Sequence, residues 1–169
     1  LTFNGQKISK SLGNVISPKI LVEKYGADSV RYFSLRQFPF ASGDDGDFSE
    51  SALVDRHNNE LANKLGNLVL RVSTLAEKYG IEKSTGKKLD SKKVYNKAAG
   101  YFENYELDKV LNEIFAFVDL CNEYVQEKKP WETHDKKVLY ELSNAIKDIA
   151  ILLSPFMPST SEKIASTFG

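Results

Sequence analysis

Hydrophobic residues recur at three- and four-residue steps along most of the chain, which is the spacing of one face of an α-helix. The longest such face predicts a helix over residues 51–79 and consists of Leu61, Leu65, Leu68, Val72, Leu75 and Tyr79. The same spacing predicts further helices over about 91–104, 107–128, 139–153 and 160–167. Helices of this length joined by short loops pack most simply as an antiparallel bundle.

The first 47 residues have a different sequence pattern. Glycines and prolines interrupt them, so only short helices and strands are expected there. Residues 1–5 form a strand-like run. Ser17-Pro18 is a helix start, since serine can cap and proline fits the first helical position. We expect helices over 19–25 and 28–37, the second burying Val30, Phe33 and Leu35.

The change from short, interrupted segments to long helical periodicity falls near residue 48. Asp47 and Ser49 are candidate caps for the long helix, and Asp47 with Glu50 has the spacing of a capping box. We therefore expect a small α/β module over 1–47, followed by a mainly α domain, a four- or five-helix bundle, over 48–169.

The charge is balanced, with 23 basic and 23 acidic side chains in 169 residues. This excludes a protein that coats polyanions in general, but not one with a local nucleic-acid patch. The single cysteine, Cys121, cannot form an internal disulfide, so we expect a reducing, cytoplasmic location. No run approaches the roughly 18 apolar residues of a membrane span. Because the chain begins at Leu1, we expect a piece of a longer protein.

The first chemically informative cluster is Lys7-Ile8-Ser9-Lys10-Ser11, which lies between Gly5 and Gly13. Ammonium and hydroxyl groups at this density suit a chain of phosphates. The glycine and lysine spacing of a P-loop is absent, and a solvated surface turn is the alternative interpretation.

This cluster resembles the Lys-Met-Ser-Lys-Ser signature of class I aminoacyl-tRNA synthetases, with Ile8 in place of methionine. The resemblance implies that Lys7, Ser9, Lys10 and Ser11 face the phosphates of ATP, and that Lys10, supported by Lys7 and Ser9, acts in catalysis. The motif identifies the class and not the amino acid.

Three further segments, 28–50, 59–71 and 122–132, resemble the methionyl-tRNA synthetase family. The resemblance implies that the module is the stem-contact part of that enzyme and the bundle its anticodon-binding domain. Cysteinyl-tRNA synthetase shares the Asp-Phe-Ser-Glu run and is the alternative. A stand-alone RNA-binding module is a second alternative, from another functional class.

Proteins read an anticodon loop by laying unstacked bases on aromatic or guanidinium planes and bonding their edges. Asn67 and Arg71 are one helical turn apart, and the only tryptophan, Trp131, follows Pro130 at a helix break, where we expect a loop. The resemblance implies that these four residues recognise the anticodon CAU. Taken alone, they could equally be polar helix surface and a core anchor.

The resemblance also implies what the parent enzyme does: it joins methionine to tRNA with ATP and Mg²⁺, through an adenylate. The Rossmann catalytic half is absent from this sequence. We therefore expect the chain to bind the tRNA(Met) anticodon stem-loop, to need the missing N-terminal domain for activity, and to hold no cofactor itself. His57 and His134 lack the neighbouring ligands that a metal site needs, so we expect no metal.

Overall fold

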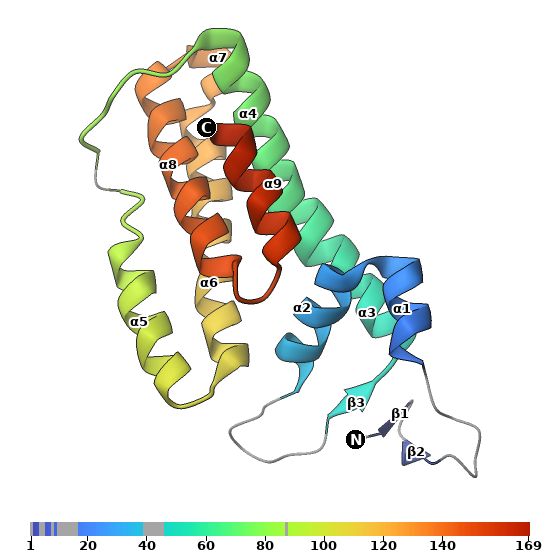
Figure 1. Cartoon of the computed structure of the whole chain (residues 1–169). Helices are drawn as coiled ribbons and strands as arrows, with labels where there is room; N and C mark the ends of the chain where they lie inside the picture. Colours follow the sequence, from blue (N-terminus) through green and yellow to red (C-terminus); the bar gives the residue numbers. More distant parts are fainter. Residues whose placement is uncertain (1, 4–5, 8, 10–16, 39–45, 87) are drawn as a thin grey trace.

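The computed structural model describes residues 2–3, 6–7, 9, 17–38, 46–86 and 88–169 (Figure 1). Its elements are β1 (Thr2–Phe3), β2 (Gln6–Lys7), α1 (Pro18–Tyr25), α2 (Ala27–Gln37), β3 (Asp47–Phe48), α3 (Glu50–Arg56), the π-helix η2 (His57–Gly66), α4 (Asn67–Tyr79), α5 (Lys92–Glu103), α6 (Leu107–Lys128), α7 (Pro130–Thr133), α8 (Lys136–Leu153) and α9 (Pro158–Phe168). The helices expected in the bundle are confirmed, and α7 is additional.

The N-terminal module has a small sheet and a small core of its own. β1 lies between β2, to which it is antiparallel, and β3, to which it is parallel. The core consists of Leu21, Phe33, Phe48 and Leu53. The rings of Phe33 and Phe48 meet edge to face with centroids 5.3 Å apart. The strand-like start is confirmed at Thr2–Phe3, while residues 1, 4 and 5 lie outside the described residues, and both predicted helices are confirmed.

The burial predicted for α2 is only partly right. Phe33 is buried, whereas Val30 and Leu35 are partly exposed, and Tyr32 is buried instead. The reason is that α2 contacts two groups of residues, with Phe33 facing the core of the module and Tyr32 facing the core of the bundle.

The start of α3 confirms one predicted cap and contradicts the capping box. The Ser49 hydroxyl accepts a hydrogen bond from the backbone N–H of Ala52 at 3.1 Å. Asp47 instead lies on β3, where its carboxylate accepts a hydrogen bond from the Thr2 hydroxyl at 2.6 Å. Asp47 therefore belongs to the sheet and does not provide the cap for α3 that the residue spacing predicts.

The helix predicted over 51–79 has the predicted extent, but its middle part, η2, is π-helical. In a π-helix the backbone bonds run from residue i to i+5, so each turn is wider than in an α-helix. Gly66 ends this segment, and a Cβ there would lie only 3.2 Å from the Leu61 carbonyl oxygen. A π segment of this kind places residues on faces that an α-helical period does not predict.

The bundle is formed by α4, α6, α8 and α9, which lie side by side in Figure 1, with α5 packed on α6. Its centre is fully buried and consists of Leu68, Val72, Val118, Cys121, Leu142, Ile146 and Ile149. Within the described ranges, no helix is both long enough and apolar enough to cross a membrane.

A charged cluster joins the module to the bundle. The Glu60 carboxylate on η2 accepts hydrogen bonds from the Tyr32 hydroxyl and from the guanidinium groups of Arg36 and Arg56. Burial opposes ionisation of Glu60, but these hydrogen bonds and the two positive charges outweigh it and hold its pKa below the ordinary value. The module is thus attached to the bundle through an ionised, largely buried carboxylate.

Candidate nucleic-acid interface

A hollow of about 470 Å³ opens between α4 and α7. The residues that line it are Asn67, Leu70, Arg71, Thr74, Leu75 and Trp131. Asn67, Arg71 and Trp131, which sequence reasoning selected from two distant segments, therefore share one concave surface.

The α-helical period of α4 explains why Asn67 and Arg71 face outward. Leu68 and Val72 are buried in the bundle, so the residue before each lies at the flank of the helix, one turn from the other. Asn67 is exposed and Arg71 half-exposed. Within the described part of the chain, neither side chain has a hydrogen-bond or ion-pair partner. Their donors and acceptors are thus available to a ligand.

Trp131 lies on a short helix, α7, and not in the loop that the sequence predicted. Lys129 adopts a left-handed conformation with φ of 44° and reverses the chain after α6. Pro130 then takes the first position of α7 and is buried, so it positions the turn but does not line the hollow. The indole of Trp131 is half-buried against the bundle core, and its Nε1–H donates to Glu132 at 3.3 Å.

Three other polar residues of η2 and α4 do not line the hollow. Lys64 forms an ion pair with Asp119 of α6 at 2.8 Å, and neither Asn63 nor Lys78 is among the lining residues. A glycine at position 66 is explained by the close approach of the Leu61 carbonyl oxygen. Gly66 faces a different hollow.

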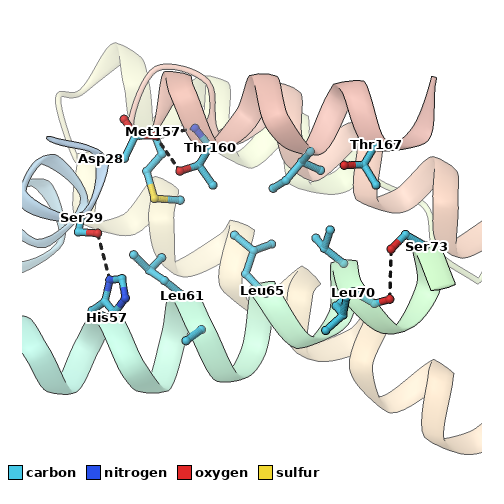
Figure 2. Close-up of a pocket in the computed structure, with 14 residues that line it drawn as sticks. Asp28, Ser29, His57, Leu61, Leu65, Leu70, Ser73, Met157, Thr160 and Thr167 are labelled. Carbon is cyan, nitrogen blue, oxygen red and sulfur yellow. Dashed lines mark hydrogen bonds between the residues drawn. The ribbon is translucent and has the colours of Figure 1, made fainter. Parts of the chain in front are cut away.

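That other hollow, of about 460 Å³, lies between α2, η2, α4 and α9 (Figure 2). Its walls are mainly apolar and include Leu61, Leu65, Val69, Met157 and Ile164. Hydrogen bonds between Ser29 and His57 (3.0 Å) and between Asp28 and Thr160 lie at one end of it. None of the predicted site residues lines this hollow. No sequence pattern predicted it, because its lining residues come from segments that are far apart in the sequence.

The signature cluster is described only in part. Lys7 lies on β2, where its backbone is described, and Ser9 is half-buried. Lys10 and Ser11 lie outside the described residues. The roles expected for these four residues toward ATP stay predictions.

The histidines have aromatic or hydroxyl neighbours. Within the described ranges, no group of three or more histidine, cysteine or acidic side chains is placed to hold a metal ion. His57 is hydrogen-bonded to Ser29, and the ring of His134 stacks on Tyr79.

Comparisons with known proteins agree on one family. Residues 1–73 match the class I tRNA synthetases (M), and residues 90–169 match the anticodon-binding domain of tRNA ligases. The methionine–tRNA ligase of Caldanaerobacter subterraneus is 40% identical over 100% of this chain and 29% of its own length. That of Thermotoga maritima is 39% identical over 97% of this chain and 28% of its own length.

The fold gives the same result. The structure of Mycobacterium tuberculosis methionyl-tRNA synthetase in complex with methionyl-adenylate superposes with a TM-score of 0.86 at 30% identity, covering 96% of this chain and 36% of that one. This chain thus spans less than a third of the length of the curated relatives above.

Proposed function

Because this chain belongs to the methionyl-tRNA synthetase family, we propose that it is the part of a methionine–tRNA ligase that binds the anticodon of tRNA(Met). One observation carries the proposal: an indole, a guanidinium and a carboxamide from two elements line a single hollow of the bundle.

The three groups suit an unpaired anticodon base. The Trp131 ring offers a flat surface on which a base can stack, and such stacking contributes about 1–3 kcal/mol per base. Arg71 can form two parallel hydrogen bonds to a base edge or a phosphate, and Asn67 can both donate and accept. Leu70 and Leu75 add apolar surface to the lining of the hollow.

We assign residues 1–47 to the stem-contact module and 48–169 to the anticodon-binding domain, whose first residues Phe48 and Leu53 complete the core of the module. Hydrogen bonds from Arg31 to the backbone carbonyls of Pro155 (2.8 Å) and Phe156 (3.1 Å) support a fixed relation between the two. A fixed relation is what an enzyme needs if one end of its tRNA is read by the bundle while the other reaches a distant catalytic domain.

In the parent enzyme, ATP and Mg²⁺ would supply the activated methionine. We propose that Lys7, Ser9, Lys10 and Ser11 contact the ATP phosphates there, with Lys10 offsetting the charge of the leaving pyrophosphate. The catalytic half is not part of this sequence, so methionine activation by the chain alone is not expected. A cytoplasmic location fits the single reduced thiol of Cys121.

Titration of the chain with an anticodon stem-loop tests the proposal. A CAU loop should bind more tightly than a scrambled loop, and the ratio should persist when the salt concentration is raised, because phosphate attraction is screened while base contacts are not. Trp131→Leu, which keeps an apolar side chain against the core, should remove most of the preference. Equal affinity for the two loops at both salt concentrations would refute the proposal.

A further inference from the structure

A second pair of rings lies where the C-terminal end of α4 meets the end of α7. Tyr79 and His134 are stacked, with ring centroids 4.1 Å apart and planes inclined by 25°. His134 is exposed and Tyr79 is half-buried. The pair therefore lies at the surface, and one side of the imidazole is not covered by the core.

The stack continues directly from the hollow on both elements. On α4, Tyr79 follows Leu75, a lining residue, by four positions, and side chains at this spacing are neighbours on a helix. Directly after α7, His134 follows Trp131 by three positions, and its backbone N–H donates to the Pro130 carbonyl at 3.0 Å. Tyr79 thus lies one helical turn beyond Leu75, and His134 follows Trp131 by about one turn of the chain.

The backbone holds the imidazole in place. His134 has φ of 53°, a left-handed conformation that is uncommon for residues other than glycine but that asparagine, aspartate and histidine adopt more often than most. The next residue, Asp135, caps α8 by accepting hydrogen bonds from the N–H groups of Lys137 (2.9 Å) and Val138 (3.2 Å). The end of α7 and the cap of α8 together fix the backbone from which the ring projects, and the ring itself stacks on Tyr79.

The charges around the stack permit a phosphate to approach. The Lys78 ammonium lies 5.0 Å from the centre of the Tyr79 ring. Among the nearby carboxylates, Asp135 accepts hydrogen bonds from the N–H groups at the start of α8, and Glu82 and Glu132 form exposed ion pairs with Lys137 and Lys129, each at 3.6 Å. Pairs this exposed are weak and rearrange easily.

We propose that the Tyr79–His134 stack is a second base platform, which takes the anticodon-loop nucleotide next to the one that lies against Trp131. The inference rests on the proposed function, since it extends the same RNA surface by one nucleotide. Every base has a π-face, so a ring at this position would add affinity with little preference for sequence. Lys78 would then lie near the phosphate of that nucleotide.

Substitution of His134 separates stacking from a structural role. His134→Asn removes the ring but keeps a residue that tolerates the left-handed conformation, whereas His134→Tyr keeps a ring. We expect His134→Asn to weaken binding of the CAU stem-loop about fivefold and His134→Tyr to leave it within about twofold. The control is Tyr105→Ala, which removes another exposed ring at a positive φ, of 58°, just before the start of α6, whereas α7 follows the end of α6.

Stem-loops that lack one base identify the contact. The effect of His134→Asn should vanish on the loop without one particular base, and the effect of Trp131→Leu on the loop without a different base. If Trp131→Leu weakens binding and His134→Asn does not, or if His134→Asn weakens all loops equally, the second platform is wrong while the proposed function stands. If no loop is preferred by the unaltered chain, the proposed function fails and the second platform with it.

Discussion

The Asp28 carboxylate on α2 accepts hydrogen bonds from both the backbone N–H and the hydroxyl of Thr160 in the first turn of α9, at 2.6 Å and 2.7 Å. It thereby does for α9 what an N-cap side chain does within a helix, because it satisfies one of the unpaired N–H groups at the helix start. The carboxylate also lies near the positive end of the helix dipole. A residue of the N-terminal module thus stabilises the last helix of the bundle.

Asp28→Ala should therefore destabilise the whole chain and not only the module. Loss of a cap costs about 1–2 kcal/mol, and we expect a decrease of that size in the free energy of unfolding measured in urea by circular dichroism. Asp55→Ala, which removes an exposed carboxylate from α3, is the matched control and should change the free energy by less than about 0.5 kcal/mol. Equal effects of the two variants would contradict a capping role.

The Glu60 cluster predicts a dependence of stability on pH. Because the folded-state pKa of Glu60 lies below the ordinary 4.5, its stabilising effect is complete above that value and is lost as the pH falls through the lowered folded-state pKa. Glu60→Gln should be destabilised by about 2 kcal/mol at pH 7, and the difference from the unaltered chain should shrink below pH 4.5.

Urea unfolding of both proteins from pH 7 to pH 3 measures this difference. Glu162→Gln, at an exposed position of α9, should show no such trend. A deficit of Glu60→Gln that stayed constant across the range would mean that the ionised form of Glu60 is not the stabilising one.

Arg71→Lys keeps the charge but removes the planar fork of the guanidinium. If Arg71 bonds a base edge, CAU binding should weaken about tenfold or more, since a bidentate base contact is worth about 1–3 kcal/mol, while binding to a scrambled loop and the salt dependence should not change. A contact to phosphate alone would survive this substitution. Lys163→Ala, which removes an exposed positive charge from α9, controls for general attraction to RNA.

The Cys121 thiol should be inert in the folded chain. It is fully buried in the bundle core, and burial raises its pKa to about 12. Reaction with a thiol reagent at pH 8 should therefore follow the opening of the fold and accelerate in urea to the rate of a free cysteine. Fast labelling without denaturant would show that α6 opens locally.

Features that depend on residues close together in the sequence could be predicted, and features that depend on distant residues could not. Helical periodicity and proline and glycine positions predicted α1, α2, α5, α6, α8 and α9 well, because an α-helix is determined by contacts within one turn. The same logic placed Asn67 and Arg71 on one flank, since they are four residues apart on α4. It misjudged Asp47, whose carboxylate bonds Thr2 from a distant strand.

The amino-acid sequence by itself thus determined the helical bundle, the short module before it and the residue types suited to an anticodon. Only the tertiary structure decided the π-helical segment, the hollow that brings Trp131 beside Arg71, and the stack of His134 on Tyr79. Each of these depends on which side chains meet across helices, and that is decided by the packing of the whole core and not by the spacing of residues along one segment.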